Sequence, residues 1–316
     1  MGTIVTTPWC PRFASFPVLR FLLGLLVAVA LGGCAQSFRP PGRAVPGPAG
    51  AFAAAPLSGG RIAVLAGDDR TKAVFIIDQR TGVVLGSYGV TKEATGIAAQ
   101  SDDGPLLLSV GAKRDGKVVG AVEQWSLDGI KERIVPMPTE ALGITPVERG
   151  VAYVLLAADG GVRAAVPIDA PSLRVGSAIP LGADASSLQH CWSDDGDYLL
   201  YSEGDRQRLT IRHIGSNGEA QSEVVADGEA CSRDGSYAYA IAGDALGRNV
   251  LVMSLPQLGA LRSIPASRDA IALYETDDHH LVALNSTRRV ATIETFRGDA
   301  FDQRTAANQF TASIAR

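Results

Sequence analysis

Two cysteines near the middle of the chain are the residues best placed to do chemistry. Cys191 directly follows His190, and the stretch that begins at Cys231 is similar in sequence to the stretch that begins at Cys191. If the protein is exported, an even pair favours a Cys191–Cys231 disulfide; two buried free thiols and a metal or redox role are the alternatives. Aligning Ser193 with Ser232 leaves the cysteines offset by one residue. That offset weakens the disulfide prediction, because successive residues of a strand face opposite sides.

Histidines and paired aspartates are the other groups that could hold a metal ion. No spacing among them resembles an EF-hand loop or a calcium-binding nonapeptide repeat. Asp side chains commonly bond local backbone in turns, so we interpret the pairs as turn residues and predict no metal site and no cofactor. The pairs at residues 102–103 and 194–195 lie in a repeated turn, so we expect them to give one face of the folded domain a negatively charged rim. The groups are His190, His279, His280 and residues 68–69, 102–103, 194–195 and 277–278. His213 lies on an alternating strand and is expected to be exposed or locally hydrogen-bonded.

Motifs of nucleophilic, metalloprotease and phosphate-binding sites are missing. The chain contains no GxSxG, no HExxH and no Gly-rich phosphate loop, so no catalytic residue is predicted. A formal net charge of −4 offers no basic patch, which argues against a nucleic-acid partner. Trp125 and Trp192 are interpreted as packing residues, with a ligand platform as the alternative.

The N-terminus is typical of an export signal. Arg12 and Arg20 precede the apolar run at residues 21–31, which is followed by small residues. The run is shorter than the roughly 20 residues that cross a bilayer. A single-pass anchor is the alternative, and translation starting near Val18 would give a shorter basic region.

The sequence LGGC at residues 31–34 resembles the lipobox of bacterial lipoproteins. The resemblance implies that residues 1–33 are removed and that Cys34 carries a thioether-linked diacylglycerol and an acylated amine. Several acyl chains would hold the protein on a membrane permanently. Ala35 stands where an Asp would imply inner-membrane retention, so the resemblance implies the outer membrane, facing the periplasm.

The next segment is rich in Pro, Gly and Ala. Residues 39–60 contain few side chains able to build a core. We therefore expect residues 34–60 to form a lipidated tether, and residues 61–316 to form the folded domain.

From residue 61 onward the chain predicts repeated β structure. Apolar runs of 5–8 residues are bounded by Gly, Asp, Ser and Asn. A Ser-x-Asp-Gly turn recurs at residues 101–104, 193–196 and 232–235, and more loosely at 147–150 and 276–280. A second landmark, an apolar strand ending in a polar turn, recurs every 38–50 residues. Its apolar markers are Ile77, Leu127, Ile168, Ile214, Leu255 and Ile293.

A unit of this length with two turns holds about four short strands, which is the size of a β-propeller blade. The Ser-x-Asp-Gly turn and the ending IDQRTG at residues 77–82 resemble repeats of bacterial YVTN-type and TolB-type propellers. We predict six blades, with boundaries near residues 91, 138, 182, 227 and 267; seven blades are the main alternative. Residues 51–57 or 310–315 could supply the innermost strand of the first blade.

These features favour a lipid-anchored envelope propeller that binds a protein partner or scaffolds an assembly. The alternatives are a propeller enzyme, such as a lyase, hydrolase or lactonase, and a sensor of a small ligand or metal. A crowd of His, Asp, Glu and Arg at one mouth of the central channel would favour the enzyme. An apolar or sparsely charged mouth would favour the binding protein.

Overall fold

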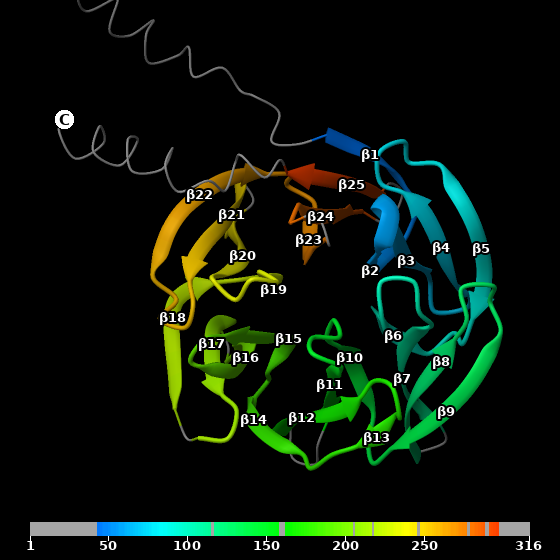
Figure 1. Cartoon of the computed structure of the whole chain (residues 1–316), viewed down its shortest axis with the longest axis horizontal. Coiled ribbons are helices and arrows are strands. Elements are labelled where there is room, and N and C mark those ends of the chain that lie inside the picture. The colour runs from blue at the N-terminus through cyan, green and yellow to red at the C-terminus, as the bar shows by residue number, and fades with distance from the viewer. Residues whose placement is uncertain are drawn as a thin grey trace, which may run out of the picture. The chain divides into compact units, whose positions relative to one another are not determined.

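The described residues form a six-bladed β-propeller. The computed structural model describes residues 43–114, 117–157, 162–204, 206–216, 218–244, 247–276, 279–287 and 291–296. Their strands make six antiparallel sheets around a central axis (Figure 1). This confirms the predicted fold and selects six blades over seven.

Each blade is a four-stranded sheet, with one edge split in the third blade. Figure 1 shows the first strand of every blade nearest the axis. From the axis outward, the first blade consists of β2 (Ala51–Leu57), β3 (Arg61–Gly67), β4 (Lys72–Asp78) and β5 (Val84–Val90), and the second of β6 (Ala94–Ala99), β7 (Leu106–Arg114), β8 (Lys117–Trp125) and β9 (Lys131–Met137). The third blade consists of β10 (Ala141–Ile144), β11 (Val151–Ala157), β12 (Val162–Asp169) and β13 (Arg174–Val175) with β14 (Ile179–Ala183), and the fourth of β15 (Ser186–Ser193), β16 (Gly196–Glu203), β17 (Arg208–His213) and β18 (Glu219–Val225). The fifth blade consists of β19 (Glu229–Cys231), β20 (Tyr237–Asp244), β21 (Gly247–Ser254) and β22 (Ala260–Ala266), and the sixth of β23 (Ala270–Glu275), β24 (Leu281–Ser286), β25 (Ala291–Phe296) and β1 (Arg43–Gly47).

The ring is closed by the N-terminal strand. β1 pairs with β25 and completes the sixth blade, and β2 is the innermost strand of the first blade. The predicted tether is therefore wrong for residues 43–60, and the propeller begins at Arg43 instead of residue 61. Pro46 is compatible with β1 because that strand is the outer edge of its sheet.

The composition of β2 also has a structural reason. Ala54 and Ala55 are buried, and small side chains fit where six inner strands converge. The predictions for residues 1–33, Cys34 and residues 310–315 fall outside the described residues. Within the described ranges, no helix has the length and apolarity of a membrane-spanning segment.

The hydrophobic core lies between neighbouring blades. Each of six apolar clusters combines residues of two adjacent sheets, including the last sheet and the first. Three of the repeat markers, Ile77, Ile168 and Ile293, are fully buried in these clusters. The repeated apolar strand thus exists because every blade must cover the face of the next one.

The repeated polar turns join the first and second strands of their blades. In the fifth blade, the Asp234 side chain accepts the Ser236 backbone N–H at 3.0 Å, and Gly235 has a φ of 75°. Such a φ favours glycine. We call the end of the ring that carries these turns the turn end, and the other the opposite end.

Candidate functional site

The central channel has a hollow at each end. The hollow at the turn end, about 70 Å³, is lined by the last residues of the six inner strands and the turns that follow. The hollow at the opposite end, about 210 Å³, is lined by residues nearer the beginnings of those strands. The two ends differ in the number and kind of ionisable side chains that line them.

Four charged side chains from four blades converge on the turn-end hollow, and we call them the mouth cluster. They are Asp102, Glu148, Arg233 and Glu275. The Arg233 Nη1 atom lies 3.7 Å from Asp102 Oδ1, across the channel mouth from the second blade to the fifth. The Arg233 backbone N–H also donates to the Glu275 carboxylate. One guanidinium therefore stands among three carboxyl groups.

The two glutamates of the mouth cluster are hard to ionise. Burial raises the pKa of Glu148 to about 6, and Glu275 adds to this rise while Arg233 opposes it. Burial also raises the pKa of Glu275, whose side chain is 6% exposed; the N–H of Arg233 opposes that rise. Near neutral pH the charge of this mouth is thus adjustable.

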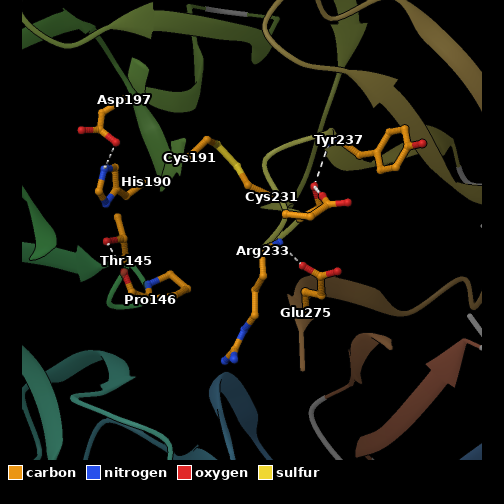
Figure 2. Close-up of a disulfide and its surroundings, with 11 residues drawn as sticks. Thr145, Pro146, His190, Cys191, Asp197, Cys231, Arg233, Tyr237 and Glu275 are labelled. Atoms are coloured by element: carbon orange, nitrogen blue, oxygen red, sulfur yellow. Dashed lines mark hydrogen bonds and ion pairs between the residues drawn. A yellow bond between two sulfur atoms is a disulfide. The ribbon is translucent and has the colours of Figure 1, made fainter. Parts of the chain in front are cut away.

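A histidine–aspartate pair stands at the edge of the same hollow. His190 Nε2 lies 3.8 Å from Asp197 Oδ1, and the Tyr153 ring meets the imidazole edge-on at 4.9 Å (Figure 2). Burial lowers the pKa of His190, although Asp197 opposes the shift, so the ring is neutral at pH 7. Neither ring nitrogen has a hydrogen-bond partner among the described residues.

The predicted disulfide is present next to this pair. Cys191 and Cys231 are bonded, with Cα atoms 5.5 Å apart, and they join the inner strands of the fourth and fifth blades. Figure 2 shows the bond between His190 and Arg233, with the Arg233 side chain extending away from it. The disulfide holds together the two blades that contribute His190 and Arg233.

The predicted aspartate turns are confirmed where they are described. The Asp68 carboxylate accepts the N–H groups of Arg70 and Thr71. Asp103 contacts Ser58 and Arg61 at the turn end. The exposed Asp194 and Asp195 occupy the equivalent turn of the fourth blade, whereas Asp277 and Asp278 fall outside the described residues. In the part of the chain that the structure describes, no three His, Cys, Asp or Glu side chains are grouped as metal ligands would be.

Both tryptophans have packing partners, as interpreted, and the remaining histidines are separate from the mouth cluster or at its edge. Trp125 stacks on Tyr88 at 6.1 Å, and the guanidinium of Arg149 lies 4.0 Å from the centre of the Trp192 ring. His213 packs edge-on against Tyr198 at 5.0 Å. His279 Nδ1 lies 3.6 Å from Glu275, and the N–H of His280 donates to Thr276 within the same turn.

Sequence reasoning missed Glu148, Arg233 and Glu275 as site residues. Each comes from a different blade, so no contiguous motif marks the cluster. A usable signal did exist for Glu148 and Arg233, because they lie within the repeated turn at positions that vary from blade to blade. Residues that vary inside an architectural repeat are the ones free to make a site.

The chain resembles solved propellers in fold alone. No family model and no curated protein match it. A Kuenenia stuttgartiensis hydrazine synthase chain is 15% identical, with a TM-score of 0.53 over 82% of this chain and 98% of that one. A glucose dehydrogenase is 13% identical, with a TM-score of 0.55 over 81% and 100%. The Cps50 (Swd1) propeller domain of Myceliophteria thermophila is 15% identical, with a TM-score of 0.53 over 80% and 98%.

Two of these three proteins are named as enzymes and the third as a propeller domain. The fold therefore supports no single activity, and function must be argued from the site. The YVTN-type and TolB-type resemblance holds for the fold, while membership in either family stays a prediction.

Proposed function

We propose that the protein is a lipid-anchored binding protein of the cell envelope whose turn-end mouth receives a cationic side chain of a protein partner. The observation that carries this proposal is the convergence of Asp102, Glu148 and Glu275 around the single guanidinium of Arg233. Three carboxyl groups and one cation leave the site short of positive charge.

The pKa of Glu148 supports a cationic ligand. Its carboxyl group holds its proton to about pH 6 because burial is only partly offset by Arg233. A lysine ammonium or arginine guanidinium in the hollow would take the place of that proton and favour the ionised form. The ligand thus supplies the charge that the mouth cluster lacks.

The size of the hollow favours a side chain over a free metabolite. A volume of about 70 Å³ is less than half that of a cavity that binds benzene, roughly 150 Å³. The end of one Lys or Arg side chain fits such a space, while the exposed turns around it would contact the rest of the partner. The acidic turn residues Asp103, Asp194 and Asp195 would steer a basic partner toward the mouth.

The predicted anchor also supports a partner near the membrane. β1 is antiparallel to β25, which places Arg43 beside Thr295 at the turn end. Only eight residues, 35–42, separate Arg43 from Cys34. Fully extended at about 3.3–3.6 Å per residue, they would reach roughly 30 Å. The mouth cluster would then lie on the side of the ring from which the anchor leaves.

An enzyme is the second candidate, and a specific observation favours it. The mouth has the crowd of titratable side chains that sequence reasoning associated with catalysis. Glu148, with a pKa of about 6, and the neutral His190 could both act as general bases near neutral pH. Against this, His190 and Asp197 are 3.8 Å apart, beyond hydrogen-bonding distance.

In-cell photo-cross-linking separates the two candidates. A photoreactive residue at Asp194 should capture one envelope protein, and the double variant Glu148→Gln/Glu275→Gln should abolish capture. The same probe at Leu261, exposed on the outer strand β22, is the matched control and should capture nothing. Capture that survives the double variant would contradict the proposed site. A small molecule consumed by the purified wild type but not by Glu148→Gln would establish the enzyme instead.

A further inference from the structure

The hollow at the opposite end differs from the turn end in size, in lining and in its ionisable groups. All six inner strands contribute to its walls, and its volume is about 210 Å³. Most of its lining is apolar, including Phe52, Leu142, Leu188 and Ile271. None of the described residues that line it is Lys, Arg or His. Its only ionisable carboxyl groups are those of Asp227 and Glu229.

Glu229 is buried in this wall without a partner. The residue is 1% exposed, and neither of its carboxyl oxygens makes a hydrogen bond within the described structure. Asp227, two residues earlier, is instead paired with Arg248 at 2.7 Å. A buried polar group without a partner is costly, so such groups usually meet a ligand or an ordered water. Burial raises the pKa of Glu229 to about 8, and the neighbouring Ser187 side chain opposes the rise.

We propose that this hollow binds a small amine with an apolar body, whose ammonium group pairs with Glu229. The apolar walls would cover the body of the ligand, and the absence of cationic lining residues disfavours an anion. One unpaired carboxyl group is too few for a divalent metal, which needs several oxygen ligands. The volume exceeds the roughly 150 Å³ that holds benzene, so a benzyl-sized group fits.

Binding of such an amine must release a proton. At pH 7 the free protein holds Glu229 as the neutral acid, and the amine arrives as the ammonium cation. Pairing requires the carboxylate, so the Glu229 proton leaves to the buffer while the ammonium keeps its own protons. With the pKa of about 8, release amounts to about 0.9 protons per amine at pH 7 and about 0.5 at pH 8, a range in which the amine stays protonated. Apparent affinity rises about tenfold from pH 6 to pH 7 and about fivefold from pH 7 to pH 8.

Isothermal titration calorimetry of the purified propeller with benzylamine tests this proposal. Titrations in two buffers of different ionisation enthalpy measure the released proton directly. Benzyl alcohol, which has the same shape and no charge, should bind at least tenfold more weakly. Glu229→Gln, which keeps the shape of the side chain, should weaken benzylamine binding at least tenfold and abolish proton release.

Two further variants separate a ligand site from a structural role. Gly143 lines the hollow, and a Cβ added there meets no atom within 4 Å, so Gly143→Leu should fill the space and abolish binding without displacing backbone. Glu294→Gln changes a buried carboxyl group with a raised pKa that does not line the hollow, and should leave binding unchanged. The proposal is overturned if benzylamine shows no saturable binding up to about 10 mM. Equal binding by Glu229→Gln, or equal binding of benzyl alcohol, also overturns it.

Discussion

The disulfide between Cys191 and Cys231 joins two neighbouring blades at equivalent positions of their first hairpins. Cys191 lies opposite Tyr198, and Cys231 lies opposite Ala238, so each cysteine faces the seventh residue after it. Equivalent steps of adjacent inner strands face each other across the gap between blades. The Cα separation of 5.5 Å is therefore a consequence of the repeat itself.

This equivalence removes the offset that the sequence suggested. Aligning Ser193 with Ser232 assumed that both turns are built alike. In the fourth blade the ladder continues to a Ser193–Gly196 pair, whereas in the fifth blade the ladder of β19 ends at Cys231. The same turn residues therefore close a shorter loop in the fourth blade than in the fifth. When the two hairpins are aligned by their paired strand residues instead of by their turns, the two cysteines occupy equivalent positions.

Removing the disulfide should destabilise the ring markedly. The bond closes a loop with a sequence separation of 40, for which chain entropy predicts a loss of about 4 kcal/mol in the free energy of unfolding. Urea unfolding of Cys191→Ala/Cys231→Ala against the wild type measures that loss. Thiol labelling of the unfolded, unreduced wild-type propeller should find neither cysteine free. Labelling of both would contradict the bond.

Ring closure by β1 should be equally measurable. Val45 is 4% exposed and lies opposite Ile293 in the ladder that joins β1 to β25. Val45→Ala deletes buried methyl groups and should cost about 2 kcal/mol. Val84→Ala makes the same chemical change at a side chain that is 50% exposed, and should cost less than about 0.5 kcal/mol. Equal costs in urea unfolding would show that β1 does not hold the ring closed.

The sequence could predict the ring because every blade must solve the same packing problem. The spacing of residues such as Ile77 and Ile168 therefore revealed the blade number and boundaries. It offered residues 51–57 as one of two candidates for the innermost strand of the first blade, and the structure confirms that choice. It did not predict β1, because a strand at the ring edge can be built from Ala and Pro. The mouth cluster was unpredictable for a different reason. Glu148 and Arg233 meet only after the ring closes, and their proximity is set by the whole circumference.

The pKa of Glu148 should respond in opposite directions to the removal of two of its charged neighbours, Arg233 and Glu275. Arg233 lowers that pKa and Glu275 raises it, around a value of about 6. Arg233→Gln should therefore move the carboxyl titration to higher pH, and Glu275→Gln to lower pH. Carboxyl carbon NMR, with Glu148→Gln to assign the signal, follows the midpoint. A midpoint that both variants leave unchanged would mean that the three groups do not share the mouth.

The predicted lipid anchor can be tested by replacing Cys34. Cys34→Ala removes the sulfur to which a diacylglycerol would be attached, while the propeller begins only at Arg43. We expect the variant to leave the membrane fraction and to lose the mass of the acyl chains. Arg43→Ala, which leaves Cys34 intact, is the control and should stay on the membrane. Unchanged membrane retention of Cys34→Ala would contradict lipidation.

Glu229 should make the folded protein less stable as pH rises. Its pKa is about 8 in the folded state and near 4.5 when unfolded, so the unfolded chain loses its proton first. The folded state binds more protons between those values, and stability must fall as pH increases from about 4.5 to 8. A tenfold change in the acid dissociation constant corresponds to about 1.4 kcal/mol. The difference between the folded and unfolded pKa values of Glu229 therefore lowers the free energy of unfolding by several kcal/mol once the pH exceeds about 8. Glu229→Gln cannot ionise, so it should match the wild type near pH 4.5 and exceed it at pH 8.5 in thermal unfolding. A wild-type advantage at pH 8.5 would mean that the carboxylate has a stabilising partner, because only a partner could offset the cost of burying its charge.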